Sequence, residues 1–198
     1  MRYKQSRKAE AHERIMRVAK SMIRSRGPEK MTVDALMGKA GLTHGGFYAH
    51  FKSRDAMVAE TVEAVFSEVA GIMQQKFGGM PPRDALLSFI DWYLSPAHRD
   101  GGIPSCPVVA FSWDLTRQSD GFRKAYKSGL EKIVGIVAGW MTAAGIGNVQ
   151  ALAASALSSL AGSIAVSRGV GELTLSDGVL AATRQSLLMR LGLEDKGS

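Results

Sequence analysis

Cysteine is nearly absent from this chain, which holds a single one, Cys106, in 198 residues. One cysteine cannot form an internal disulfide, which excludes the disulfide-stapled scaffolds of small secreted proteins and fits a reducing cytoplasm. Aromatic residues make up only 7% of the chain, whereas methionine occurs ten times. Because no segment alternates apolar and polar residues as a strand would, the sequence predicts an all-α protein.

Long uninterrupted apolar runs are also missing. The most apolar segment, residues 149–170, contains five serines and carries Arg168 near its end. A membrane span needs about 20 predominantly apolar residues, so this segment predicts a buried helix instead. The N-terminus is rich in Arg and Lys with no apolar run after it, so we expect no signal peptide. Together these features predict a cytoplasmic protein without a membrane partner.

Basic charge is confined to the first third of the chain. Residues 1–60 carry thirteen Lys or Arg and six Asp or Glu, whereas residues 61–198 carry twelve of each. The net charge of +7 therefore lies at one end. A localised basic region is expected of a surface that binds phosphates, although a solvated basic helix produces the same imbalance.

Apolar spacing predicts about nine helices. The first begins near Ala11, after a cationic arm at residues 1–8 that we expect to be mobile, and ends at Gly27-Pro28. Thr32 and Thr43 are placed to cap the second and third helices. The second is expected at 33–37 and the third after Gly41, and the others at 53–76, 86–94, 108–117, 119–144, 149–168 and 176–191.

Residues 40–52, with the sequence AGLTHGGFYAHFK, predict a turn followed by a short helix. At about 100° per residue, Phe47 and Phe51 share the face that packs inward, and Gly45 and Ala49 fall opposite. Such a bare stripe lets a helix lie deep in a DNA major groove. A glycine costs about 1 kcal/mol relative to alanine in a helix, so two need a reason. The alternative is that Gly45-Gly46 is a loop. The stripe is flanked by His44, Tyr48, Gly46 and His50.

No residue pattern in the sequence indicates a metal site or a catalytic site. His44 and His50 lie six residues apart, which does not align them on one helix face, so we expect no metal site and no cofactor. An enzyme would use Cys106 as nucleophile with His98 as base, but no third orienting group accompanies them. We therefore predict that the chain is not an enzyme. A non-specific architectural DNA-binding protein is a further alternative, but it leaves the large neutral remainder unexplained.

Residues 9–60 resemble the DNA-binding region of the tetracycline-repressor (TetR) family of bacterial transcriptional regulators. This resemblance implies an all-α protein with a three-helix helix-turn-helix domain at residues 1–52 and a ligand-binding and dimerisation domain at residues 53–198. The segments that carry it are 15–19 (IMRVA), 32–36 (TVDAL), 40–43 (AGLT), 45–52 (GGFYAHFK) and 53–57 (SRDAM).

The resemblance also implies roles for individual residues on double-stranded DNA. The phosphate contacts fall on Thr32, Thr43, Tyr48, His50 and Lys52, and the positions that approach bases are His44, Gly45, Gly46 and Ala49. Family members often carry larger or charged side chains at the base-facing positions, so few side chains are left here to read bases. DNA shape and the basic arm are therefore expected to add specificity. The arm's basic residues are Arg2, Lys4, Arg7 and Lys8.

Aromatic residues collect between positions 89 and 140. Buried Trp and Tyr need polar partners, so a group of them can line a ligand cavity, and an ordinary helical core is the alternative. The predicted effector site for a small molecule of unknown identity comprises Phe89, Trp92, Tyr93, Cys106, Phe111, Trp113, Phe122 and Tyr126.

Cys106 lies between two prolines just before a predicted helix. A helix N-terminus stabilises a thiolate, so we expect a lowered thiol pKa. Residues 105–110 resemble a Gly-Cys-Pro stretch of a TetR subgroup in which some members sense electrophiles or oxidants, with Ser105 in place of the glycine. The alternative is a buried cysteine with a packing role.

The last two predicted helices, 149–168 and 176–191, combine small residues with an apolar stripe. The resemblance implies that this pair forms a four-helix bundle in a homodimer, and the alternative is that it only closes the core of one chain. A twofold dimer places two reading helices on a near-palindromic operator. The sequence thus predicts a transcriptional repressor that a small-molecule effector, or modification of Cys106, releases from DNA.

Overall fold

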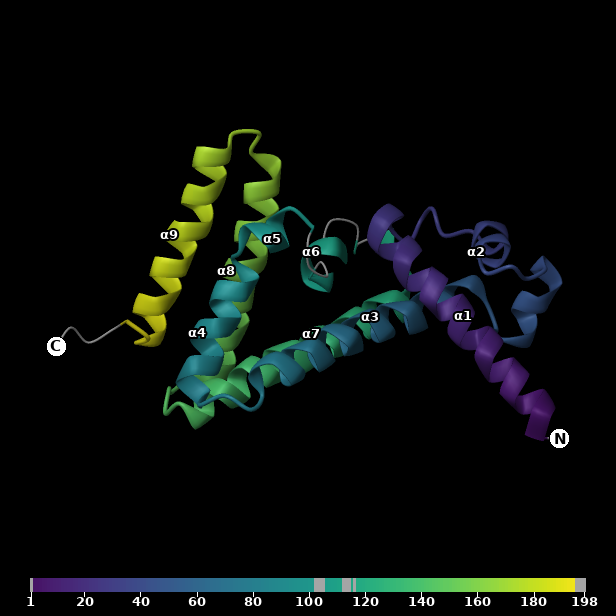
Figure 1. The fold of residues 1–198 in the computed structure, drawn as a ribbon, viewed down its shortest axis with the longest axis horizontal. Helices are drawn as coiled ribbons and strands as arrows, with labels where there is room; N and C mark the ends of the chain where they lie inside the picture. The colour runs from purple at the N-terminus through teal and green to yellow at the C-terminus, as the bar shows by residue number, and fades with distance from the viewer. Residues whose placement is uncertain (1, 102–105, 112–114, 116, 195–198) are drawn as a thin grey trace. The chain divides into compact units, whose positions relative to one another are not determined.

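The computed structural model describes residues 2–101, 106–111, 115 and 117–194, with side chains from residue 6 onward, and these residues are helical with no strand (Figure 1). The predicted all-α class is therefore confirmed. The helices are α1 (Arg2–Arg26), α2 (Val33–Lys39), the 3-10 helix η1 (His44–Ala49), α3 (Arg54–Phe77), α4 (Pro82–Tyr93), α5 (Pro96–Arg99), α6 (Pro107–Phe111), α7 (Asp120–Ala143), α8 (Val149–Gly169) and α9 (Leu173–Leu191).

Helix boundaries follow the local signals closely at most ends. Helix α9 begins three residues earlier than expected, at Leu173, and three further differences lie between α3 and α7. The short helix α5 was not predicted. Helix α4 begins four residues earlier than expected, at Pro82, because proline is tolerated in the first turn of a helix. The predicted helix at 108–117 is present as α6 over its first part, and residues 112–114 and 116 of that prediction lie outside the described residues.

The basic arm differs from its prediction, because from Arg2 onward its backbone is the first part of α1. Neither glycine nor proline interrupts residues 2–26, and the Ser6 hydroxyl donates a hydrogen bond to Glu10 one turn later, at 2.7 Å. The helix ends where Gly27 adopts φ +74°, as the Gly-Pro signal predicted.

The chain forms two compact units, which we describe separately. The head unit comprises residues 1–67 and 110–129, and the body unit comprises residues 68–109 and 130–198.

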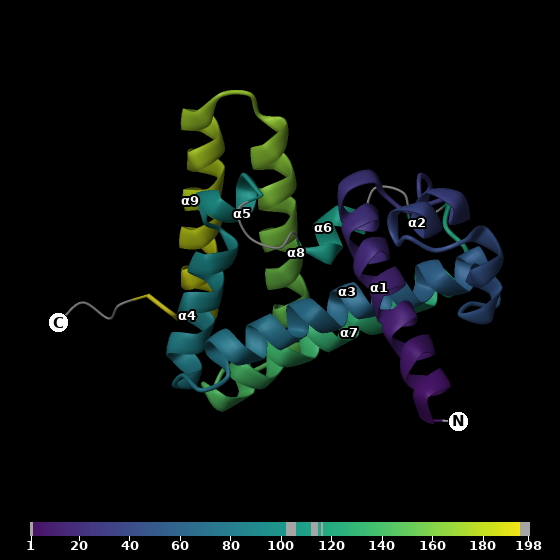
Figure 2. The same ribbon diagram turned by 45° about the vertical axis from the view of Figure 1, so that its right-hand side comes forward.

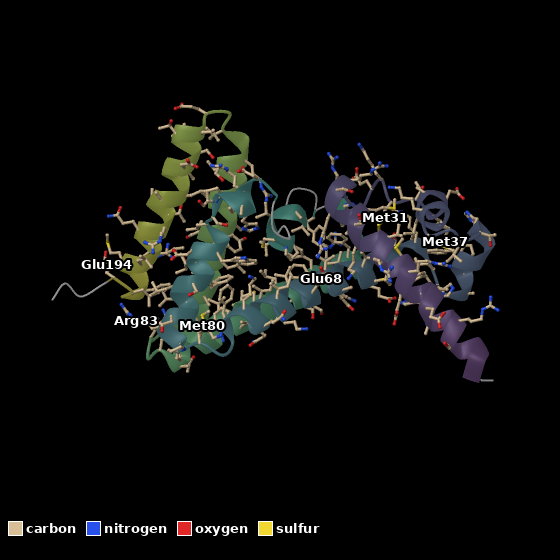
Figure 3. All side chains as sticks on the ribbon, in the orientation of Figure 1. Met31, Met37, Glu68, Met80, Arg83 and Glu194 are labelled. Carbon is tan, nitrogen blue, oxygen red and sulfur yellow. The ribbon has the colours of Figure 1, made fainter. Side chains whose placement is uncertain are left out.

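In the head unit, apolar residues of α1 and α2 form a core with the first half of α3. Met31 and Met37, labelled in Figure 3, are almost fully buried there. Arg54, the first residue of α3, donates hydrogen bonds to the carbonyls of Pro28 (2.5 Å) and Met31 (3.0 Å). It thereby fixes the turn between α1 and α2.

Contact between α3 and α7 in the head unit depends on a glycine. A Cβ added at Gly129 would lie 2.2 Å from Cγ of Phe66, which is far below any real contact. Only glycine lets the backbone of α7 approach the Phe66 ring this closely.

In the body unit, α8 and α9 lie side by side as an antiparallel pair (Figures 1 and 2). Arg83 on α4 donates to the carbonyls of Gly192 and Glu194, both at 2.8 Å, and so holds the end of α9 (Figure 3). Helix α8 is the one described helix long and apolar enough to span a membrane by length and composition alone. It packs against α9 along its length.

Candidate nucleic-acid interface and ligand cavity

The turn and short helix predicted at residues 40–52 are present in the head unit. The Thr32 hydroxyl caps α2 by accepting a hydrogen bond from the Ala35 N–H at 3.2 Å. Gly41, with φ +65°, ends α2 and turns the chain toward η1. Thr43 occupies the N-cap position of η1, but its side chain makes no capping hydrogen bond, which differs from the prediction.

Two phenylalanines determine which face of η1 points outward. Phe47 and Phe51 are 0% and 4% exposed, and their ring centroids lie 5.3 Å apart. Gly45 and Ala49 are exposed, as the helical spacing predicted, although the helix is of the tighter 3-10 type. Tyr48 is 65% exposed. The outward face of η1 therefore combines a nearly bare stripe with an unburied aromatic hydroxyl.

The fold itself does not require glycine at positions 45 and 46. Neither residue has a positive φ. A Cβ at Gly45 would meet nothing within 4 Å, and one at Gly46 would make only ordinary contacts with Thr43 and Met37. Neither the backbone conformation nor the packing of the free head unit therefore explains these two glycines.

His44 is held by a residue that the sequence did not point to. Its Nδ1 lies 2.5 Å from a carboxylate oxygen of Asp34 on α2. Because a carboxylate only accepts hydrogen bonds, Nδ1 carries the proton and Nε2 is left for another partner. In the sequence, this partner is only a carboxylate ten residues before His44. No local rule pairs two residues at that spacing.

His50 is the partly buried histidine of this surface. Burial lowers its pKa, and the charges of His12 and Lys8 lower it further. Its Nδ1 is buried without a hydrogen-bond partner. His12 in turn contacts Glu60 at 2.6 Å and stacks on Phe51 at 4.9 Å. At neutral pH His50 is therefore uncharged in the free protein and has an unused ring nitrogen.

The remaining predicted DNA contacts lie at exposed positions. Lys52 is exposed two residues before α3 begins. Arg7 and Lys8 are exposed on the first turns of α1, where Arg2 and Lys4 also lie; the side chains of those last two are outside the described residues.

A narrow cavity lies within the body unit. It admits only about one water-sized molecule unless side chains move. Four predicted effector residues line it, and His98, which the prediction omitted, joins them. The lining residues are Val69, Met73, Phe89, Trp92, Tyr93, His98, Cys106, Ile133 and Leu157.

The structure does not bring the other predicted effector residues to this cavity. Phe111, Phe122 and Tyr126 lie in the head unit, where Phe111 and Tyr126 pack on Phe66 and Phe122 packs on Phe111. Trp113 lies outside the described residues.

Burial decides the ionisation of Cys106. The residue is 4% exposed, and burial raises the pKa of its thiol. Hydrogen bonds from Tyr93 and from the backbone N–H groups of Val109 and Val108 oppose this rise without overcoming it. The predicted lowering of the thiol pKa is therefore wrong. The helix N-terminus does contribute, but desolvation is the larger effect.

His98 is 1% exposed, and both of its ring nitrogens are occupied. Nδ1 donates to the Tyr93 carbonyl at 2.7 Å, and Nε2 accepts the backbone N–H of Cys106 at 3.2 Å. Burial lowers the pKa of His98, and Arg168 lowers it further, whereas the bond to Tyr93 raises it. A neutral imidazole without a spare nitrogen cannot accept the thiol proton of Cys106, so this geometry argues against the enzyme alternative.

Large apolar side chains remain exposed on the α8–α9 pair. Of the six exposed large hydrophobic residues in the described chain, four belong to these two helices. The four are Val166, Leu173, Leu175 and Met189, which are 54–68% exposed.

Comparison with known families gives one sequence match. Residues 15–61 match the model of a family described as bacterial regulatory proteins, tetR family. This match covers α2, η1 and the turn between them. The family consists of regulatory proteins rather than enzymes. A comparison with curated proteins gives no significant match.

Solved structures share the fold over nearly the whole chain. The reduced form of NemR from E. coli is 17% identical with a TM-score of 0.77, over 89% of this chain and 96% of NemR. A TetR-family regulator from Cytophaga hutchinsonii is 18% identical with a TM-score of 0.79, over 96% and 98% of the two chains. The regulatory protein TetR from Rhodobacter sphaeroides is 20% identical with a TM-score of 0.70, over 92% and 97%.

At these identities the structural likeness shows the fold, and membership of a cysteine-sensing subgroup stays a prediction. The sequence match lies on the turn and short helix predicted to bind DNA. Residues 15–61 thus match the tetR family of bacterial regulatory proteins, and nearly the whole chain shares the fold of solved TetR-family regulators.

Proposed function

We propose that this protein is a cytoplasmic repressor that binds a near-palindromic DNA operator as a homodimer and is released by a small-molecule effector or by modification of Cys106. Residues 1–52 act as its DNA-binding domain, and residues 53–198 as its ligand-binding and dimerisation domain. The function rests on one observation above all: the exposed Gly45 is required neither by backbone conformation nor by space within the protein.

A helix that enters a major groove explains such a glycine. With Gly45 and Ala49 outward, the backbone of η1 can approach base edges more closely than a helix with full side chains. His44, Gly45, Gly46 and Ala49 face the bases in this proposal. Contacts to phosphates flank them, from Thr32, Thr43, Tyr48, His50 and Lys52, with the arm residues Arg2, Lys4, Arg7 and Lys8 adding charge along α1.

His50 is suited to a phosphate contact. Its partly buried ring is neutral in the free protein, and its Nδ1 has no partner. A phosphate oxygen supplies both an acceptor and a negative charge, which favours the protonated ring. DNA binding would then be accompanied by proton uptake at His50.

The exposed apolar residues of α8 and α9 support a homodimer. Burying Val166, Leu173 and Met189 against a second copy of the same helix pair removes their apolar surface from water. A twofold arrangement of this kind also presents two copies of η1 to related half-sites.

The effector site in this proposal is the cavity in the body unit. Its lining is mainly apolar, and its polar groups come from Trp92, Tyr93, His98 and Cys106. A small, largely apolar effector fits such a lining. The cavity geometry does not support effector contacts by Phe111, Phe122 or Tyr126. Trp113 lies outside the described residues.

Gly45→Ala tests the reading face directly. We expect unchanged or slightly higher folding stability, because alanine favours a helix by up to about 1 kcal/mol. Affinity for DNA should fall about tenfold, or about 1.4 kcal/mol, because the added methyl prevents close approach. The operator is first selected from a random DNA library with the natural protein, and affinity is then measured by fluorescence anisotropy. Gly71→Ala is the matched control, because Gly71 is an exposed glycine on α3 with nothing within 4 Å. Equal affinities of the two variants would contradict the proposal, and uniform coating of DNA in a footprint would favour an architectural protein.

A pH titration tests His50. Its pKa is lowered in the free protein, so protonation on DNA should make affinity rise as pH falls from about 8 to about 6, by at most tenfold per pH unit for each proton taken up. His50→Gln, which retains His44, should show a shallower slope at the same ionic strength. Identical slopes for the two proteins would rule out proton uptake at His50.

Met189→Arg tests the dimer. Light scattering after size exclusion should give twice the 21.2 kDa chain mass for the natural protein and a single chain mass for the variant, since a buried unpaired arginine opposes association. Met80→Arg, in the turn before α4, is the control and should remain dimeric (Figure 3). A single chain mass for the natural protein at micromolar concentration would overturn the dimer.

Alkylation tests the cysteine route, because the chain has only one thiol. N-ethylmaleimide should react slowly at neutral pH, since Cys106 is buried and its thiol pKa is raised. We expect the adduct, verified by mass spectrometry, to lower operator affinity, while Cys106→Ser should show no change on the same treatment. An alkylated protein that binds the operator as before would leave only the non-covalent effector.

A further inference from the structure

Helix α5 is a single turn whose last two residues make contacts in different directions within the body unit. The His98 side chain forms part of the cavity wall and accepts the backbone N–H of Cys106. The next residue, Arg99, directs its guanidinium to the start of α9, where it donates to Ser176 at 3.1 Å and to the Asp177 carboxylate. One turn of helix thus contacts both the cavity and the α8–α9 pair.

Arg168 near the end of α8 fixes the backbone of the same turn. Its Nη2 donates to the carbonyl of His98 at 2.7 Å, and its Nε donates to the carbonyl of Arg99 at 2.9 Å. The Ser176 hydroxyl closes the network by donating to the Ser167 carbonyl on α8 at 2.9 Å. We call Arg99, Arg168, Ser176 and Asp177 the α5 clamp.

Ion pairs and hydrogen bonds hold the α5 clamp in place. The Arg99 side chain is only 8% exposed and contacts two carboxylates, those of Asp100 and Asp177. A guanidinium offers several donors in a fixed plane, so bidentate contacts hold both position and orientation. A displacement of α5 therefore has to break or re-form charge-assisted hydrogen bonds with both α8 and α9.

We propose that the α5 clamp carries the state of the effector cavity to the α8–α9 pair, with Arg99 and Arg168 as the positioning residues of this route. The inference rests on the proposed function, since it concerns how that cavity would control the proposed dimer helices. It assigns to the clamp a coupling role in addition to stabilising the fold.

The size of the cavity favours this coupling for any effector larger than water. Because the cavity is so narrow, such an occupant must displace lining side chains. His98 is the lining residue whose own backbone carbonyl is bonded to α8. Movement of its ring also disturbs the bond to Cys106, so adducts at Cys106 and occupants of the cavity act on the same turn.

The test measures how fast the single thiol reacts when the clamp is broken at a distance. Coupling is reciprocal, so a clamp that transmits displacement from the cavity must also restrain the cavity. We expect iodoacetamide to label Cys106 about tenfold faster in Asp177→Asn and in Arg168→Met than in the natural protein, the effect of losing about one charge-assisted hydrogen bond. Neither Asp177 nor Arg168 lines the cavity. Labelling is followed by mass spectrometry without denaturant.

Asp91→Asn is the matched control. Asp91 on α4 pairs with Arg184 on α9 through both carboxylate oxygens, at 2.6 and 3.2 Å, so the same chemical change removes an ion pair of α9 that does not involve α5. We expect its labelling rate to stay within about twofold of the natural protein. Urea unfolding of every variant shows how much labelling global unfolding explains.

Hydrogen exchange measures the coupling in the opposite direction. Carbamidomethylation of Cys106 should speed amide exchange at residues 164–177 in the natural protein but have little further effect in Arg168→Met. The proposal is overturned if Cys106 is labelled at the same rate in the clamp variants as in the natural protein. It is equally overturned if Cys106 is labelled in none of the proteins. It is also overturned if Asp91→Asn accelerates labelling equally, or if the adduct leaves exchange at 164–177 unchanged.

Both measurements are made without DNA. If the protein binds no operator but shows the expected labelling pattern, the clamp proposal stands and the proposed function is wrong. If the protein binds an operator and an effector releases it, but all variants are labelled at the same rate, the proposed function stands and the clamp proposal is wrong.

Discussion

The burial of Phe47 and Phe51 is the constraint on which the DNA-facing surface depends. Fully burying an aromatic side chain of this size contributes about 1.5–3 kcal/mol, so rotating η1 to present other residues would sacrifice a large share of the head unit's stability. With that orientation fixed, the outward positions fall on Gly45 and Ala49. Evolution of specificity at this surface is therefore limited to changes of those residues and their flanks, without rotation of the helix.

Local signals were sufficient to predict most of the head unit. The caps at Thr32 and Gly41 depend on a few neighbouring residues, so spacing and residue type were enough to place the helix ends. The cationic arm was misjudged because a polar, charged composition is shared by surface helices and by extended chains. The sequence also did not predict the 3-10 form of η1.

Tertiary contacts explain what the sequence could not predict in the body unit. Aromatic spacing located a region, but which rings meet depends on helix packing, and Phe111 packs away from the cavity that Phe89 and Tyr93 line. The pKa of the Cys106 thiol also depends on tertiary contacts that the sequence does not show. Its helix N-terminus was visible in the sequence and favours the thiolate, whereas its burial, the larger and opposite effect, was not.

The saturated hydrogen bonding around His98 sets a limit on how the body unit can respond. Both ring nitrogens and its carbonyl are occupied, so any displacement exchanges existing bonds for others rather than filling a vacancy. Converting a population from 1:99 to 99:1 requires about 5.5 kcal/mol of differential binding, whereas one charge-assisted hydrogen bond contributes about 1.5–3 kcal/mol. The loss of one bond of the clamp therefore cannot complete a switch. Either several bonds of the clamp change together, or the proposed dimer contacts of α8 and α9 supply the remaining free energy.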